Sequence, residues 1–112
     1  MTMIVLPFPP ASLSGHHDKH WRVMQPIKKA HRQMAFAATW DAHLTVPQDG
    51  DIPIHFRFVP PDRRGDRTNY PNRLKPYIDG IADALAVNDR RFLPSYEFAE
   101  PEKPGRVEVE LG

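Results

Sequence analysis

Apolar and polar residues alternate over residues 52–58, a spacing that predicts a strand with one buried face. The apolar positions are Ile52, Ile54, Phe56 and Phe58, and His55 and Arg57 fall between them. The same alternation over 107–111 predicts a last strand, and shorter runs predict strands at 3–6 and 96–99.

Apolar residues recur at helical spacing in two other segments. A first helix is predicted from about Gln25, with Pro26 in its first turn, where a missing N–H costs least. The predicted buried stripe of this helix is Ile27, Ala30, Met34, Ala37, Ala38 and Leu44. A second helix is predicted to start near Asn69 or Asn72 and to be regular over about 75–86. Its predicted buried face comprises Leu74, Ile78, Ile81 and Leu85.

Gly80 falls in the middle of the second helix, where it costs roughly 1 kcal/mol relative to alanine. A glycine at this position indicates that the sheet or a partner helix approaches the backbone closely. The elements follow the order βαβαββ, which predicts a small α/β (α+β) fold with a mixed sheet of about four strands and two helices. With 112 residues, the chain is expected to form a single domain over 1–112.

The composition narrows the class of protein. The chain is 40% hydrophobic and 26% charged, which is typical of a soluble globular domain. It has no cysteine, so disulfide and thiolate chemistry are excluded and a reducing compartment fits. No apolar run approaches the ~18 residues of a membrane span, and the N-terminus lacks the basic start of a signal peptide. We therefore expect a cytoplasmic protein with no membrane partner.

Basic residues concentrate in two segments, although the formal net charge is only +1. On the outward face of the first helix they are Lys28, Lys29 and Arg32. In the loop before the second helix they are Arg63, Arg64, Arg67 and Arg73. Arginine offers a rigid fork of donors that suits phosphate oxygens, and Tyr70 is a candidate for stacking on a base or sugar. These residues are candidate DNA contacts, and the alternative interpretation is a solvated loop.

Aspartates surround the second helix. They are Asp66 before it, Asp79 and Asp83 within it, and Asp89 after it. Carboxylate oxygens suit hard cations such as Mg²⁺, and Lys75 shares a helix face with Asp79 and Asp83. A helix over 73–87 is ~22 Å long at about 1.5 Å per residue. Asp66 and Asp89 therefore share a metal only if the loop folds back or a second subunit contributes. A surface charge pattern is the alternative.

The loop before the first helix offers a second metal hypothesis, because it contains His16, His17, Asp18 and His20. Their spacing matches no zinc motif closely. We instead expect a loop over the active face, anchored by Trp21, which is a further candidate DNA contact. The remaining histidines are expected to be structural, namely His31, His43 and His55.

Three segments in series resemble the RusA-type Holliday junction resolvases, a family of small endonucleases common in phages and prophages. The opening segment reads VLPFPPASLSGHHDKHWR. It is similar to the family's first strand, which is followed by LP-[FW]-PP and, in one branch of the family, by HWR. The centre is similar to D-x-D-N, a lysine and a helix with Asp-Gly, and it reads DRTNYPNRLKPYIDGIADAL. The third segment is similar to the family's turn ending in paired acids, and it reads AVNDRRF.

The resemblance implies a mixed α/β fold, a homodimer, and dependence on Mg²⁺ with Mn²⁺ as a substitute. It also implies symmetrical phosphodiester hydrolysis in four-way DNA junctions, in recombination and repair, by a cluster of aspartates and a lysine. In the register that retains most family residues, the matching positions are Asp66, Asn69, Lys75, Asp79 and Asp89. Thr68 and Asn88 then stand where the family has acids. In the other register Asn72 is the motif asparagine, and both preceding acids are lost, to Asn69 and Pro71.

Each lost carboxylate removes a charge and an oxygen ligand from a Mg²⁺ site. The first hypothesis is a Mg²⁺-dependent junction endonuclease in which Asp66 and Asp89 bind metal. Asp79 or Asp83 would assist, and Lys75 would stabilise the phosphate charge.

The second hypothesis is a junction-binding protein with a degenerate site, and the third is a dimeric α/β protein with an unrelated ligand. The twofold symmetry of a junction favours a dimer, and we expect the face around Gly80 to leave room for the partner.

Overall fold

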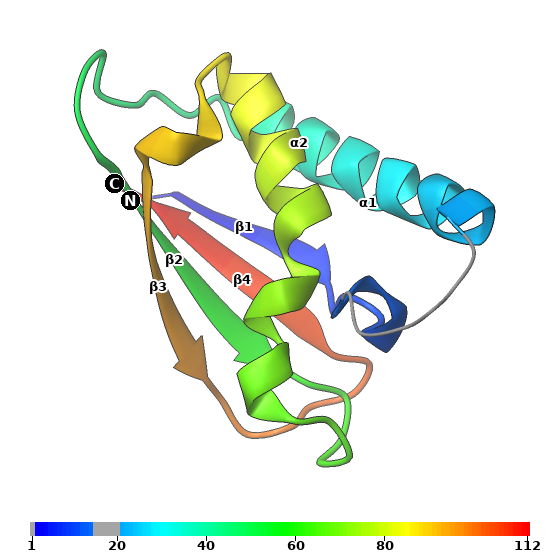
Figure 1. Ribbon diagram of the computed structural model, residues 1–112. Helices are drawn as coiled ribbons and strands as arrows, with labels where there is room; N and C mark the ends of the chain where they lie inside the picture. The colour runs from blue at the N-terminus through cyan, green and yellow to red at the C-terminus, as the bar shows by residue number, and fades with distance from the viewer. Residues whose placement is uncertain (1, 15–20) are drawn as a thin grey trace.

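The computed structural model describes residues 2–14 and 21–112. Within these residues the strands are β1 (Thr2–Pro7), β2 (Ile52–Val59), β3 (Phe92–Phe98) and β4 (Arg106–Leu111). The helices are α1 (Trp21–Asp41) and α2 (Lys75–Leu85) (Figure 1). Short 3₁₀ turns lie between them, namely η1 (Ala11–Ser14), η2 (Arg67–Asn69), η3 (Pro71–Arg73) and η4 (Asp89–Arg91). The predicted fold class, a mixed four-stranded sheet with two helices, is confirmed.

The strands lie side by side in the order β1-β4-β2-β3. Strand β4 is antiparallel to both of its neighbours, whereas β3 is parallel to β2. Because β2 and β3 are parallel, α2 must carry the chain back along the whole sheet between them. The loop that follows β2 and the turn that precedes β3 consequently lie at opposite ends of the sheet (Figure 1).

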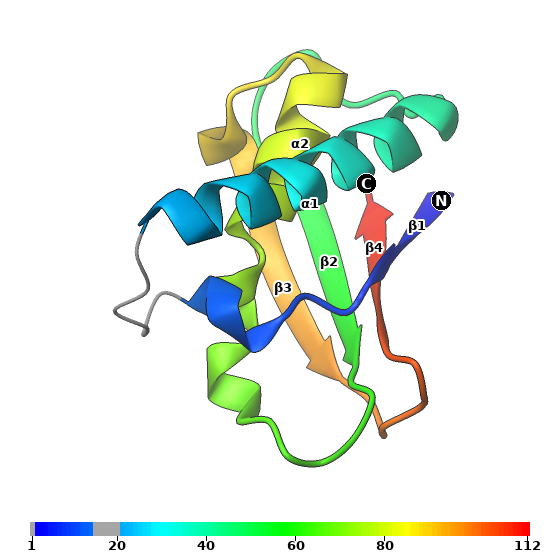
Figure 2. The ribbon, with the colours of Figure 1, turned by 90° about the vertical axis from the view of Figure 1, so that its right-hand side faces the viewer.

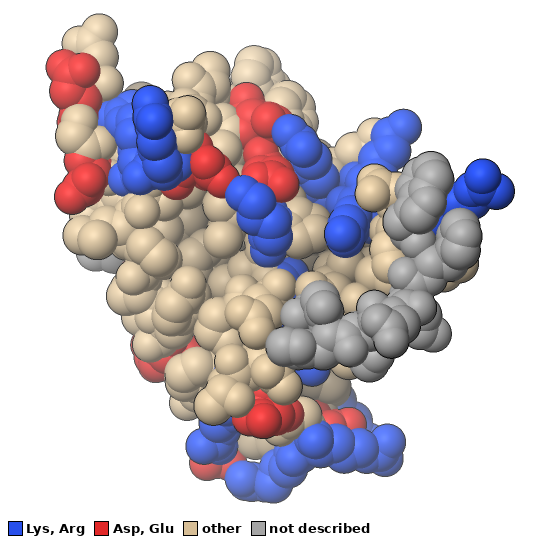
Figure 3. Space-filling view, in the orientation of Figure 1, with Lys and Arg blue, Asp and Glu red and all other residues tan. Residues whose placement is uncertain are grey.

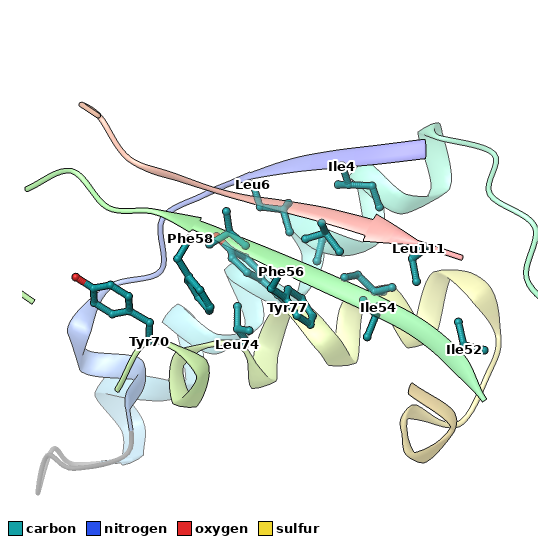
Figure 4. Packing of buried hydrophobic residues seen from close by; sticks show 14 residues of the cluster. Ile4, Leu6, Ile52, Ile54, Phe56, Phe58, Tyr70, Leu74, Tyr77 and Leu111 are labelled. Atoms are coloured by element: carbon teal, nitrogen blue, oxygen red, sulfur yellow. The ribbon is translucent and has the colours of Figure 1, made fainter. Parts of the chain in front are cut away.

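Both helices cover the same face of the sheet (Figure 2). The apolar positions predicted for β2 are all buried on this face, and they lie against Leu74 and Tyr77 (Figure 4). Ile81 of α2 belongs to the same buried cluster. The Tyr77 hydroxyl donates to the Pro7 carbonyl at 2.7 Å, which satisfies the one polar atom of that buried ring. The alternating pattern over 52–58 therefore predicted β2 correctly.

Gly80 lies where α1 crosses α2. A Cβ atom at this position would lie 2.2 Å from the Arg32 carbonyl oxygen and 3.0 Å from the Phe36 nitrogen. The close backbone approach indicated by the sequence is thus made by α1 of the same chain. The expectation that the Gly80 face leaves room for a second subunit is wrong, because α1 fills that space.

Helix α1 differs most from its prediction. It begins at Trp21 rather than near Gln25, so Pro26 lies in its second turn and not its first. Two predicted core positions, Ala30 and Ala37, are exposed. Met34, Ala38 and Leu44 are partly buried against the core, as predicted. The fully buried residues of α1, however, are Met24, Ala35 and Thr39. The helix packs against α2 as well as β1, and this second contact rotates the buried stripe.

Strand β3 begins at Phe92, before the predicted start at Tyr96. It is the edge strand next to β2, and nearly all of its residues are exposed. An exposed edge strand has no contrast in burial between alternate residues, so the pattern does not reveal its full length. Among the described residues, neither helix is both long enough and apolar enough to span a membrane.

Candidate functional site

Lys75 joins two of the predicted site aspartates. It is the first residue of α2, and its Nζ lies 3.0 Å from Oδ1 of Asp79 and 2.5 Å from Oδ2 of Asp89. Asp79 is one turn further along α2, whereas η4 brings Asp89 back beside the helix. Asn88 caps η4, because its side-chain oxygen accepts a hydrogen bond from the Arg90 N–H at 3.0 Å. This cap fixes the turn that presents Asp89.

The hydrogen bond from Lys75 lowers the pKa of Asp89. In return, the hydrogen bonds to Asp89 and Asp79 raise the pKa of Lys75. Both effects favour the charged forms, so this site contains an ammonium held between two carboxylates at neutral pH. The Lys75 side chain is 64% exposed, so water and ligands reach it.

A second ion pair ties α2 to α1. Arg32 donates from Nε to Oδ2 of Asp83 at 2.6 Å and from Nη2 to Oδ1 at 2.9 Å. Its Nη1 lies 4.0 Å from Asp79. These hydrogen bonds lower the pKa of Asp83. We call these five residues the α1–α2 charge cluster: Arg32, Lys75, Asp79, Asp83 and Asp89.

A cleft of about 490 Å³ adjoins this cluster, between the two helices. Its lining comprises Leu13, Gln25, Lys28, Lys29, Arg32, Lys75, Pro76 and Asp79. In Figure 3, acidic and basic side chains lie next to one another over the upper part of α2. The cleft thus unites the cations predicted on the first helix with the lysine and one aspartate predicted on the second.

Asp66 is not part of the charge cluster. Its Oδ1 accepts hydrogen bonds from the Thr68 N–H at 3.0 Å and the Thr68 hydroxyl at 2.8 Å, and it thereby caps η2. These bonds lower the pKa of Asp66. Asp66 follows the end of β2 and Asp89 precedes the start of β3, so the two lie at opposite ends of the parallel strands (Figure 1). One subunit therefore does not bring Asp66 and Asp89 together, because the loop does not fold back.

Across residues 2–14 and 21–112, no three histidine, cysteine, aspartate or glutamate residues form a group suited to a metal ion. Asp79 and Asp89 are the predicted ligands that the structure places around one point, through their shared contact with Lys75. Two carboxylates have the hard oxygen donors that Mg²⁺ takes, with water or phosphate oxygens completing its shell. Asp83 is already bound to Arg32 by two hydrogen bonds.

Two predicted DNA contacts are wrong. Tyr70 is only 2% exposed and packs edge-on against Phe8, with ring centroids 5.0 Å apart. Arg73 is 9% exposed, donates to the Pro9 carbonyl at 3.2 Å and lies over the Tyr70 ring. Pro71 begins η3, and residues three apart in a 3₁₀ turn share a face. Both side chains therefore point inward, which leaves little of either exposed to a base or a phosphate.

The other arginines of this loop are exposed. Arg63 pairs with Glu100 at 2.5 Å yet remains 72% exposed, and Arg64 is 92% exposed. Arg67 lines a cleft of about 400 Å³ with Asp66. These side chains form a basic rim at the end of the sheet remote from Asp89.

The loop histidines and Asp18 lie outside the described residues, as does the Trp21 side chain. Two of the remaining histidines have protein partners. His31 Nδ1 lies 2.7 Å from the Ile27 carbonyl oxygen, and His55 contacts Ser95 and Glu97. These contacts fit the structural role that we expected for them.

The sequence interpretation missed an exposed aromatic pair on α1. Phe36 and Trp40 are 40% and 62% exposed, and their rings stack with an interplanar angle of 8°. Their spacing of four residues was a usable signal, since such residues adjoin on a helix. The misplaced core stripe concealed it.

These features define a small α+β protein with a charged cleft between two helices on one face of a mixed sheet. No protein-family model matches the chain. It is 40% identical over 98 residues to an uncharacterized protein of Xylella fastidiosa (strain Temecula1 / ATCC 700964). The match covers 83% of this chain and 63% of that relative, so the chain spans less than two thirds of the relative's length.

Proposed function

We propose that the protein is a Mg²⁺-dependent endonuclease that binds four-way DNA junctions as a homodimer and cuts their phosphodiester backbone. The observation that carries this proposal is the placement of Lys75 between Asp79 and Asp89 at a cleft lined by further cations. An ammonium between two carboxylates offers both a contact for a phosphate oxygen and hard ligands for a divalent cation. Each of the three segments that resemble the junction resolvases has a residue in this cleft or in contact with it, namely Leu13, Lys75 and Asp89.

Lys28 and Lys29 would contact the backbone on either side of the phosphate that lies in the cleft. For a metal ion to bind, the Lys75 ammonium would have to leave Asp79 and Asp89. The two carboxylates would then hold the ion, and Lys75 would donate to an oxygen of that phosphate. A bound Mg²⁺ supplies Lewis-acid stabilisation of the phosphate and an activated water. Arg32, which is held by its pair with Asp83, lies 4.0 Å from Asp79 and would help to keep that side chain in place. Within one subunit, Asp66 is better placed to cap η2 than to bind the metal ion.

The second candidate is a junction-binding protein without nuclease activity. It is favoured by the two neutral residues at family acid positions, each of which has a structural contact of its own. Thr68 donates to Asp66 and Asn88 caps η4. Neutral oxygens are poorer ligands for Mg²⁺ than carboxylates, so this chain would then bind junctions through its cations alone.

Labelled four-way junctions and linear duplexes of the same sequence separate these candidates. The protein is mixed with each DNA with and without Mg²⁺ or Mn²⁺, and the nicks are mapped on sequencing gels. Paired symmetrical nicks that require metal support the endonuclease. Tight junction binding without nicks in either metal supports the binding protein, and equal weak affinity for both DNAs contradicts both.

A further inference from the structure

Helix α1 carries a row of four side chains at intervals of four residues. The row runs Lys28, Arg32, Phe36 and Trp40. Residues at this spacing form a continuous ridge on a helix, and twelve residues span ~18 Å. The ridge therefore begins with two cations beside the cleft and ends with the two exposed aromatic rings.

The aromatic pair is preformed, because the two exposed rings stack on each other. The two ring centroids lie 5.9 Å apart and the planes differ by 8°. A hollow of about 300 Å³ adjoins Trp40 and is lined also by Thr39, His43, Leu44, Ala84 and Leu85. The lining contains no acidic side chain, so a neutral flat ring meets no carboxylate there.

The cations indicate which ligand this ridge suits. Among the described residues, neither Lys28 nor Lys29 has a carboxylate within salt-bridge distance, and both line the neighbouring cleft. Arg32 pairs with Asp83 but keeps 50% of its side chain exposed. A purely apolar partner leaves these cations without a counterpart. A nucleic-acid strand complements the entire ridge, with phosphates at the lysines and bases at the rings.

We infer that Phe36 and Trp40 stack against unpaired bases of a DNA strand whose phosphates follow Lys28, Lys29 and Arg32. The inference rests on the proposed function and adds a preference for DNA with unstacked bases, such as the crossover of a distorted junction. The ridge is as long as about five nucleotide steps of a duplex strand. Stacking of a base on an aromatic side chain is worth about 5- to 150-fold in affinity.

The test uses a Trp21→Phe background, in which Trp40 is the remaining tryptophan. Two fluorescently labelled strands of nine nucleotides are compared by anisotropy, oligothymidine and an abasic strand with the same phosphates. We expect at least fivefold tighter binding of the thymidine strand, together with quenching of Trp40 emission. Phe36→Leu with Trp40→Leu should remove this difference while binding of the abasic strand is retained.

Matched variants and assembly measurements separate the alternatives. Phe36→Tyr with Trp40→Phe keeps the rings and should keep the preference, and circular dichroism checks the fold of each variant.

Equal binding of the two strands, or a preference that survives the leucine changes, overturns the inference. The inference is also overturned if sedimentation shows that Phe36 and Trp40 are buried in a self-association that DNA does not alter. The same Trp21→Phe protein and the wild type are also titrated with a four-way junction. If both bind the junction but do not distinguish the two strands, the inference alone fails. If neither binds any DNA, the proposed function fails too.

Discussion

Individual residues in this chain have tertiary partners that their neighbours in sequence do not reveal. Lys75 and Asp79 are four apart on a predicted helix, so their contact could be predicted. The contacts of Lys75 with Asp89 and of Arg32 with Asp83 depend on how η4 and α1 fold against α2. The inward turn of Tyr70 and Arg73 depends on the 3₁₀ geometry that begins at Pro71.

The lowered pKa of Asp89 gives a prediction at the scale of single residues. Lys75→Met should raise the pKa of Asp89 toward its ordinary value, because the hydrogen bond from Lys75 is what lowers it. The measurement is an NMR titration of the side-chain carboxyl carbons, and Lys29→Met is the matched control that should leave Asp89 unchanged. An Asp89 titration that is the same in wild type and Lys75→Met would contradict the pair.

The same pair links stability to pH. Because the folded-state pKa of Asp89 is lowered, its interaction with Lys75 stabilises the fold above the unfolded-state pKa of the carboxyl. This contribution is lost as the pH falls through the folded-state pKa. Asp89→Asn should therefore lower the urea midpoint at neutral pH, and the difference from wild type should shrink in acid. A difference independent of pH would assign the effect to another cause.

Gly80→Ala tests the helix crossing. Helix propensity alone predicts stabilisation by about 1 kcal/mol. The new Cβ would lie 2.2 Å from the Arg32 carbonyl oxygen, so α1 must move away from α2. We expect a net destabilisation of about 1–3 kcal/mol, as is typical of overpacking, measured by urea unfolding. A variant as stable as wild type would show that the helices do not approach this closely.

Among the helices and strands, those with a clear contrast between buried and exposed residues were predicted best. Strand β2 has one face buried and one half-exposed, so its alternation revealed it. Strand β3 is an exposed edge and was predicted only from Tyr96 onward. The stripe of α1 was misplaced because this helix packs against two elements, whereas a hydrophobic stripe predicts one contact direction. The error also hid the aromatic pair.

The cations of α1 give a prediction about salt. Replacing both Lys28 and Lys29 with glutamine should weaken junction binding and reduce the slope of log K against log salt by about two. The measurement is a set of binding titrations between low and moderate salt. Lys103→Gln, in the turn before β4, is the control and should preserve the slope. An unchanged slope in the double variant would exclude Lys28 and Lys29 from the phosphate contacts.

For the whole molecule, the order of helices and strands organises the site. The parallel pairing of β2 with β3 separates Asp66 from Asp89, and the crossing of α1 over α2 brings Lys28 and Lys29 beside Lys75. Sequence spacing gave the candidate acids but could not tell which of them meet, because that depends on the sheet order. The fold class was predicted from local patterns, whereas the membership of the site required the tertiary structure.

The most direct test of the account compares nicking rates on a four-way junction in Mg²⁺ for wild type and three aspartate variants. We predict that Asp89→Asn slows nicking by about 100-fold or more, the cost typical of losing one preorganised electrostatic group. Asp66→Asn should retain most activity, because it lies outside the charge cluster, and Asp49→Asn serves as an exposed control. Full nicking by Asp89→Asn, or loss only in Asp66→Asn, would contradict the placement of the site between α1 and α2.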